Sequence, residues 1–394
     1  MRLATKSAIF IALIAALLSF IKFDHCRNHG WGGSDVYIHA CYSDLPALLV
    51  DRNLNTHTWP YKSATNAVEY PPLTAMVMWS TSYLVKHDYN QYRTYFDINA
   101  LLIILLFIFV VILLKKMSPK YWYLAPLAPA VIASLFINWD IWAVLPALLA
   151  IYWFDQKLYR RSSLALGISI ATKFFPIVLL LPISLILLKN RKELIKYNAI
   201  ALGSWISINL PFALTTPKGW FRFFKLNSER GVDWGSIWHA LNIYGIKIPS
   251  LNYFSLALFV IGAMAFTIYF FKLKEFPNLA MVSIFIVAIF VTASKVYSPQ
   301  YILWLTPIAV LAITSSKEVK AFWIWQGAEL IYHLAIWQEL ASTAGAHFAI
   351  PERLYAFAIL LRVCALAYFL FTLARGKLEK SPLLLPPQAH EFPL

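Results

Sequence analysis

The stretch ALLIILLFIFVVILLKK at residues 100–116 decides the class of fold. An unbroken apolar run meets two lysines, the pattern of a helix that crosses about 30 Å of hydrocarbon and ends at a charged membrane surface. Apolar runs of similar kind recur along the whole chain, separated by polar turns too short to be domains. The sequence therefore predicts a single all-α polytopic membrane domain.

The overall composition agrees with this class. The chain of 394 residues is 60% hydrophobic and only 13% charged, whereas soluble domains are about 25% charged. These values exclude an ordinary soluble enzyme. The 34 Lys and Arg residues exceed the 19 Asp and Glu residues and give a net charge of +15. In a soluble protein this excess of positive charge would suggest nucleic-acid binding. In a membrane protein the important question is which side of the membrane carries the positive charge.

The apolar runs predict about twelve membrane helices. The run at residues 7–23 lacks a small-residue cleavage site and is therefore interpreted as the first helix rather than a signal peptide. The predicted helices are 7–23, 96–114, 121–137, 139–155, 162–173, 175–188, 196–214, 252–272, 278–294, 299–314, 321–337 and 353–374. We expect one membrane domain over residues 1–375 and a cytoplasmic tail over 376–394.

The charge of the turns predicts the orientation. The basic turns near residues 115, 157–161, 189–196, 272–274, 317–320 and 375–380 all fall on the side of the N-terminus, as expected for cytoplasmic loops. Counting residues 73–85 as a crossing would invert this pattern, so we expect them to form a juxtamembrane or re-entrant helix. The long loops 24–95 and 215–251 then lie on the outer face of the plasma membrane, where long loops are usually functional.

Two acids in the first outer loop are candidate functional groups. Asp35 follows Gly32 and Gly33, whose backbone freedom can turn a carboxylate into a cleft, and Asp44 follows nine residues later. Either acid could instead cap a helix that begins beside it. Glu69 and Tyr70 precede a Pro-Pro pair that favours a clean helix start. Glu69 is not explained by that geometry and is expected to hold the loop or touch a polar ligand.

Further polar residues lie at predicted outer positions, where ionisable groups are costly unless they are paired or meet water. Asp140 either caps the helix after it or belongs to a site, and Lys173 either snorkels to the interface or meets an anion. The second outer loop interleaves aromatic residues with cations, which suits an interfacial helix on anionic lipid or a phosphate clamp. The candidates in and near that loop are Arg222, Arg230, His239 and Lys295.

The cysteines and the absent motifs narrow the class further. Cys26 and Cys41 are close enough to pair if their loop faces an oxidising space, and are otherwise two small buried hydrophobic side chains. The sequence has no Gly-rich phosphate loop, H-E-x-x-H, G-x-S-x-G or paired-cysteine metal motif. Most standard nucleotide and metal enzymes are thereby excluded, and no metal site is expected.

Five segments in order resemble glycosyltransferase family 87 of the GT-C superfamily, which includes actinobacterial polyprenyl-phosphate-mannose-dependent mannosyltransferases. They are the first helix with its acidic outer loop, E-Y-P-P-L (69–73), N-W-D (138–140), A-T-K-F-F-P (171–176) and S-K-V-Y-S-P-Q-Y (294–301). Each segment is weak evidence alone, but their order and their common predicted face make the set more specific. The resemblance covers residues 1–375 and implies a GT-C-like fold for this membrane domain.

The resemblance implies an inverting, metal-independent enzyme without a cofactor. It would transfer a sugar, mannose before arabinofuranose, from a polyprenyl-phosphate donor to a cell-envelope glycolipid or glycan acceptor. The position of the base matches Asp35 best, and Asp44 is the alternative. Expected donor-phosphate residues are Lys173, Arg222, Arg230, His239 and Lys295. Tyr297 and Gln300 are expected to line the sugar pocket, and Glu69, Tyr70 and Asp140 to complete the substrate-binding set.

Two other function classes remain open at this stage. A transporter or flippase of lipid-linked sugars would also bind a polyprenyl phosphate through cations, but would need no base. The sequence shows no evident inverted repeat, which disfavours a transporter. A catalytically inactive envelope scaffold would not need polar residues in its outer loops. Membrane lipids are the expected surroundings, and no nucleic-acid partner is expected.

Overall fold

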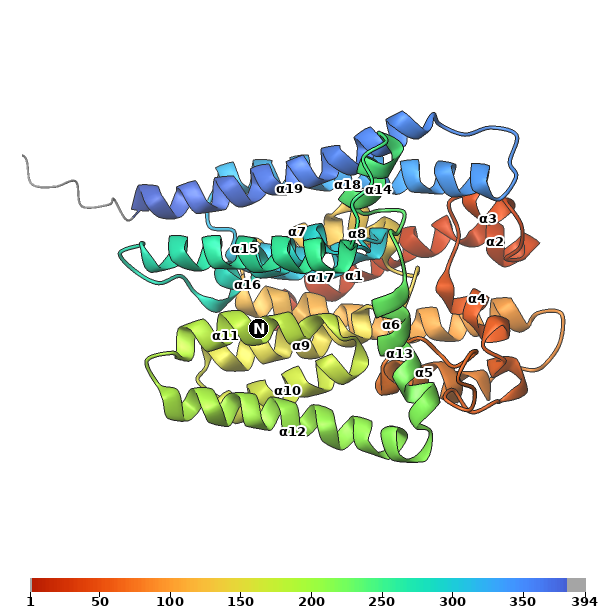
Figure 1. Cartoon of the computed structure of the whole chain (residues 1–394), viewed down its shortest axis with the longest axis horizontal. Helices are drawn as coiled ribbons and strands as arrows, with labels where there is room; N and C mark the ends of the chain where they lie inside the picture. The colour runs from red at the N-terminus through yellow and green to blue at the C-terminus, as the bar shows by residue number, and fades with distance from the viewer. Residues whose placement is uncertain (1, 381–394) are drawn as a thin grey trace, which may run out of the picture.

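The computed structural model describes residues 2–380, which are 74% helical and contain no strand. Figure 1 shows most helices running side by side along the long axis of the molecule. The helices are α1 (Arg2–Lys22), α2 (Asp24–His29), α3 (Asp35–Ile38), α4 (Asp44–Asp51), α5 (Pro72–Ser82), α6 (Gln91–Met117), α7 (Leu124–Leu127), α8 (Pro129–Ser134), α9 (Ile141–Asp155), α10 (Tyr159–Thr172), α11 (Leu180–Leu187), α12 (Arg191–Thr215), α13 (Pro217–Glu229), α14 (Ile237–Ile243), α15 (Leu251–Phe271), α16 (Leu279–Ala293), α17 (Ile302–Ala312), α18 (Ser316–Thr343) and α19 (Glu352–Lys380), with short 3₁₀ turns η1 (Leu54–Thr56), η2 (Phe175–Leu179) and η3 (Pro299–Tyr301).

Within residues 2–380, four helices are long and apolar enough to cross a membrane. They are α1, α6, α15 and α19, and the bent pair α12 and α13 would raise the number to five. These helices keep much apolar surface outside the bundle; α15, for example, has one side of Leu, Ile and Phe exposed along its length. Exposed apolar surface of this extent suits contact with lipid. The described residues therefore form an all-α protein with several candidate membrane spans.

Other predicted membrane helices are present but short. Residues 139–155, 278–294 and 299–314 correspond to α9, α16 and η3–α17, each with 10–17 helical residues. At about 1.5 Å per residue such helices are shorter than a typical hydrocarbon core. Nearly all of α16 is buried, so its apolar residues pack against neighbouring helices.

One predicted element is wrong in its continuity. Residues 121–137 do not form one helix: α7 ends at Leu127 and α8 begins at Pro129. Ala128 between them is extended, with ψ of 119°. Proline disfavours a helical conformation in the residue before it and cannot donate the backbone hydrogen bond that would continue the helix. The apolar pattern alone did not reveal this break.

The basic turns gather at one end of the bundle. Lys115 Nζ donates to Ser7 Oγ at 2.6 Å, Tyr121 donates to the carbonyl of Thr314, and Tyr269 donates to the carbonyl of Ala374. These contacts join helix ends and turns that are far apart in sequence. In Figure 1 the α11–α12 and α15–α16 turns and the C-terminal end of α19 lie together on the left.

The opposite end carries the two long loops. Helices α2 to α5 lie there, and α13 crosses the bundle nearly at right angles to its axis (Figure 1). Pro217 begins α13 after a bend of 116° from α12, and proline suits a first helical position because its missing N–H would be unpaired there. Helix α5, the predicted juxtamembrane segment, has only 11 residues and is too short to cross a bilayer.

The C-terminal boundary differs from the sequence expectation. Helix α19 continues past the predicted end at residue 374 and runs to Lys380. Residues 381–394 of the predicted tail lie outside the described range.

Candidate functional site

A cavity of about 860 Å³ lies between the long loops and the helix ends. It gathers side chains from the start of α4, the segment before α5, the α8–α9 and α10–α11 turns, α13, the loop after it, the α16–α17 turn and α18. Most of these segments are distant in sequence, so only the tertiary fold brings them together. Of the predicted site residues, seven line the cavity: Asp44, Glu69, Tyr70, Lys173, Arg230, Lys295 and Gln300.

Asp44 presents a hydrogen-bonded carboxylate to the cavity. Tyr42 donates to one carboxylate oxygen at 2.8 Å, while Asn138 donates to the other at 2.6 Å and Tyr70 at 3.2 Å. Desolvation by burial raises the pKa of Asp44 above its ordinary value despite these donors, as expected for a carboxylate removed from water. Ser43 caps α4 with its side chain, so the capping interpretation of Asp44 is wrong.

Lys173 reaches the cavity wall over a buried acid. Its ammonium lies 3.0 Å from Asp140 Oδ1, which also accepts a hydrogen bond from the Trp304 indole at 2.5 Å. The Asp140 side chain is fully buried and makes no helix-capping bond. Asp140 therefore does not cap α9 and instead holds Lys173. The same ammonium lies 5.0 Å from the Tyr70 ring centroid, within the range of a cation–π contact.

Glu69 is held at the cavity by an arginine. Arg52 donates to both carboxylate oxygens of Glu69, at 2.5 and 2.8 Å. Paired bonds of this type fix the orientation of both groups. Of the two expectations for Glu69, the structure supports a loop-holding contact directly and leaves the carboxylate on the cavity surface.

Two cations from the second loop region face the cavity. Arg230 forms an ion pair with Asp233, which itself lines the cavity. Lys295 donates to the backbone carbonyls of Asn227, Ser228 and Arg230 at 3.2, 3.3 and 2.7 Å. Partial burial lowers the pKa of Lys295, and the charge of Arg230 lowers it further. Among the side chains of residues 5–376, no carboxylate lies within ion-pair distance of Lys295.

Aromatic side chains form much of the remaining wall. Trp304 stacks between Phe175 and Tyr301, with ring centroids 3.9 and 3.7 Å apart. Phe223 and Phe224 of α13 also line the cavity. Flat aromatic faces bury large apolar areas, and a stacked face beside polar groups is a suitable surface for a sugar ring or an acyl chain.

The other predicted site residues lie outside this cavity lining. Arg222 donates to the carbonyl of Thr65 on the first long loop. His239 of α14 packs against Trp234, and burial lowers its pKa. Tyr297 is buried and donates to Glu329 at 3.0 Å. These residues connect segments around the cavity and are not part of its lining.

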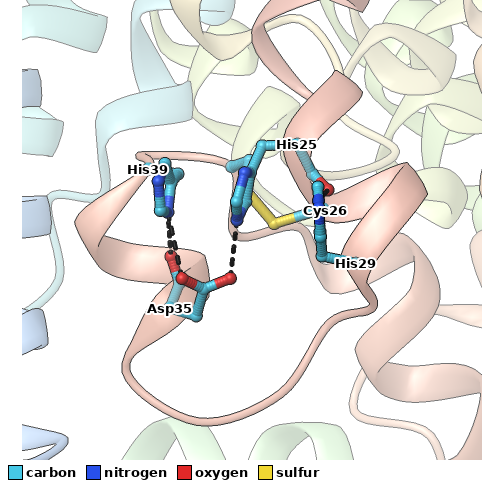
Figure 2. The surroundings of a disulfide bond; sticks show 6 residues. His25, Cys26, His29, Asp35 and His39 are labelled. Atoms are coloured by element: carbon cyan, nitrogen blue, oxygen red, sulfur yellow. Dashed lines mark hydrogen bonds and ion pairs between the residues drawn. A yellow bond between two sulfur atoms is a disulfide. The ribbon is translucent and has the colours of Figure 1, made fainter.

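Asp35 also lies outside the cavity lining. Its carboxylate contacts His25 at 2.7 Å and His39 at 3.1 Å. The hydrogen bond from His25 lowers the pKa of Asp35 most, with smaller contributions from both imidazole charges. Figure 2 shows this cluster beside a disulfide between Cys26 and Cys41. The cysteines therefore pair rather than remain free, as one of the two sequence interpretations allowed.

Several cavity residues were missed in the sequence. Asn138 lies in the N-W-D segment and Asp233 in the second long loop, but the sequence predictions name Asp140 and Arg230 in these segments instead. Tyr42 lies in the C-Y-S-D segment that contains Asp44, so its position offered a signal. Arg52 offered none, because its partner Glu69 is 17 residues away and no local pattern joins them.

Sequence comparisons do not assign the chain to a family. No protein-family model matches the sequence, and no curated protein matches it. The cavity geometry consequently carries the functional argument.

Proposed function

We propose that the protein is an integral-membrane glycosyltransferase that transfers a sugar from a polyprenyl phosphate to a glycolipid or glycan acceptor. The observation that carries this proposal is the 860 Å³ cavity, in which three carboxylates, three cations and aromatic faces meet. Of the carboxylates, Glu69 is paired with Arg52 and Asp233 with Arg230, whereas Asp44 accepts from neutral donors. Mannose is the sugar that the family resemblance implies. A carboxylate and cations on one cavity match the two demands of an inverting glycosyl transfer, a base and a stabiliser of the leaving phosphate.

The proposed reaction is a single displacement. The acceptor hydroxyl oxygen attacks the anomeric carbon and forms the new glycosidic bond as the bond to the phosphate oxygen breaks. The electron pair leaves with the polyprenyl phosphate, and the acceptor proton passes to the base. Inversion follows from attack on the face opposite the phosphate.

Asp44 is the better base on geometry. It lines the cavity, whereas Asp35 does not. Its three donors come from Tyr42, Tyr70 and Asn138, which fix the carboxylate without placing a Lys or Arg in an ion pair with it. We therefore propose Asp44, the alternative in the sequence analysis, as the group that accepts the proton.

Lys295 and Arg230 are proposed to receive the donor phosphate. Among the described residues, Lys295 donates only to backbone carbonyls, so a phosphate oxygen can pair with it without separating it from a carboxylate. Arg230 can turn from Asp233 to a phosphate, for which an arginine fork is well suited. Lys173 is bound to Asp140 and is proposed to add positive potential from deeper in the wall.

The proposed orientation follows the charge pattern. About twelve crossings, with both termini in the cytoplasm, would put the cavity on the outer face of the plasma membrane. The basic turns at one end of the bundle and the Cys26–Cys41 disulfide at the other support this orientation, because disulfides persist in oxidising spaces outside the cytoplasm.

Transfer of label tests the proposal. The full chain in lipid nanodiscs would receive radiolabelled polyprenyl-phosphate mannose and a native membrane lipid extract as the acceptor source. Asp44→Asn should lower the transfer rate about 100-fold or more, since base catalysis contributes at least that much. Asp51→Asn, at the exposed end of the same helix, is the matched control and should retain the rate.

Donor binding separates the alternatives. Asp44→Asn should bind the labelled donor as the wild type does, while Lys295→Met should raise the donor KM about tenfold, the effect of losing roughly 1.4 kcal/mol. Wild-type activity in Asp44→Asn would contradict the assignment of the base. Donor binding with no transfer by the wild type, together with movement of the labelled donor across the membrane of proteoliposomes that contain the protein, would instead indicate a transporter or flippase.

A further inference from the structure

His25, Asp35 and His39 bring three potential metal ligands to one point on the first long loop. One ligand atom from each lies within 4.8 Å of the others. His25 Nε2 is 2.7 Å from one carboxylate oxygen of Asp35, and His39 Nδ1 is 3.1 Å from the other. Figure 2 shows both imidazoles turned toward this carboxylate.

Two features of the chain hold these side chains together. Asp35 and His39 are four residues apart on the turn formed by α3, which puts them on one face. The Cys26–Cys41 disulfide closes the loop around them; Cys26 follows His25 directly, and Cys41 is two residues after His39. A cross-link between these positions restricts the loop before any ion binds, which lowers the entropy lost when the ligands are ordered.

The ligand set selects a type of ion. Two imidazoles and one carboxylate suit borderline transition metals such as Zn²⁺, whose bonds to these groups are about 2.0–2.2 Å long. The side chains are 29%, 48% and 42% exposed for His25, Asp35 and His39, so an ion can reach them from solvent. Three protein ligands also leave a coordination position for water.

No lysine or arginine among the described residues forms an ion pair with the Asp35 carboxylate. In the described part of the chain, Asp35 forms ion pairs only with the two histidines. The nearby Arg27 instead donates to both oxygens of Asp97 at 2.7 Å. The Asp35 charge is thus available to a cation, and neutral imidazoles can turn their lone pairs to the same ion.

We propose that His25, Asp35 and His39 form a binding site for a divalent transition-metal ion, with Zn²⁺ the best fit. None of the three lines the 860 Å³ cavity, but the same loop supplies Tyr37 and Tyr42 to its wall. The ion stabilises this loop and through it the cavity wall, and takes no part in the transfer of the sugar.

His29 provides a matched control. Its ring stacks on His25 with centroids 4.5 Å apart, but its Nδ1 contacts the His25 carbonyl and it is not in the ligand set. Replacing it removes a neighbouring imidazole from the same helix without removing a ligand.

Metal binding by the full chain tests the proposal without any activity assay. Chelator-washed protein in nanodiscs would be titrated with Co²⁺ alone, followed by its visible absorption, and then with Zn²⁺ in competition. The wild type should bind one ion per chain. His25→Gln, His39→Gln and Asp35→Asn should each weaken binding about 100-fold, at least the loss reported for supporting residues of metal sites, and His29→Gln should leave it unchanged.

Thermal unfolding shows whether each variant has folded. Zn²⁺ should raise the Tm of the wild type and of His29→Gln, because a ligand that binds only the folded state stabilises it. It should not raise the Tm of folded ligand variants whose disulfide is intact. The proposal would be overturned if the wild type bound no ion stoichiometrically, or if Asp35→Asn and His39→Gln bound it with wild-type affinity. The three residues would then form only a hydrogen-bonded His–Asp cluster.

Discussion

Asp35 and Asp44 are two acids of one loop with opposite surroundings. Asp35 is partly exposed between two histidines, whereas Asp44 receives three neutral donors at the cavity. The pKa of Asp35 is lowered by His25, and the pKa of Asp44 is raised by burial. The spacing along the sequence could not distinguish them, because the difference arises from partners distant in the chain.

The raised pKa of Asp44 predicts a pH dependence. The proposed base acts when ionised, so transfer should increase as pH rises through a value above the ordinary pKa of aspartic acid. Stability should change in the opposite direction, because the fold favours the protonated form of Asp44. The contribution of this group to the free energy of unfolding is complete below the ordinary pKa of aspartic acid and is lost as pH rises through the pKa of Asp44 in the folded state. The Tm of Asp44→Asn, relative to wild type, should therefore increase as pH rises above about 4, the ordinary pKa of aspartic acid. A relative decrease would contradict the raised pKa.

The buried Lys173–Asp140 pair predicts a large loss of stability. Asp140→Asn leaves a nearly buried ammonium without its carboxylate and should cost about 3–5 kcal/mol, measured by denaturant unfolding of the purified protein. Asp140→Asn combined with Lys173→Met should recover part of the loss. The exposed pair Lys225 and Glu229, 3.9 Å apart, is the control, and Lys225→Met should change stability by less than about 1 kcal/mol. Equal effects at the two pairs would contradict this account.

At the scale of elements, α13 is the helix that most shapes the cavity. It supplies Phe223 and Phe224 to the wall, and its C-terminal carbonyls bind Lys295. The sequence identified its cations and aromatics but could not show which would point inward. The helix turns Phe223 and Phe224 to the cavity, whereas Phe221 is exposed and Arg222 reaches the first long loop.

Gly219 allows α13 to lie against that loop. A Cβ built on Gly219 would lie 2.0 Å from the carbonyl oxygen of Tyr61, a backbone atom that cannot move alone. Gly219→Ala should therefore destabilise the protein by about 1–3 kcal/mol and increase proteolysis of α13. Gly203→Ala in α12 is the control: nothing lies within 4 Å of its Cβ position, and alanine should stabilise the helix by up to about 1 kcal/mol. Unchanged stability of Gly219→Ala would contradict the close approach.

At the scale of the whole molecule, the two ends of the bundle differ. One end has short basic turns, and the other has the long loops, the disulfide and the cavity. A membrane protein inserted by the charge of its loops should hold the basic end in the cytoplasm.

Thiol labelling tests this orientation. In intact cells, a membrane-impermeant maleimide should label a Tyr89→Cys variant of the Cys364→Ser chain, because Tyr89 lies exposed in the first long loop. Cys26 and Cys41 are buried and disulfide-bonded and should not react. A cysteine placed at Asn190, in the α11–α12 turn, should react only after permeabilisation. The reverse pattern would place the cavity in the cytoplasm and contradict the proposed outer-face reaction.

The sequence predicted part of the fold and of the site. The apolar runs located most helices, since burial in lipid or in a helical core requires apolar residues along the whole element. The broken helix around Ala128 was missed because its composition is apolar on both sides of the break. Segments around residues 69–72, 138–140, 171–176 and 294–301 do meet at the cavity, although the sequence did not identify Arg52 as the partner of Glu69.

The sequence by itself determined the helical class, the apolar segments and the basic turns, because each depends on composition within one stretch of chain. Only the tertiary structure decided which acid reaches the cavity, which cation has a carboxylate partner, and that Cys26 and Cys41 pair. These outcomes depend on distances between residues far apart in sequence, and electrostatic and hydrogen-bond energies change steeply with such distances.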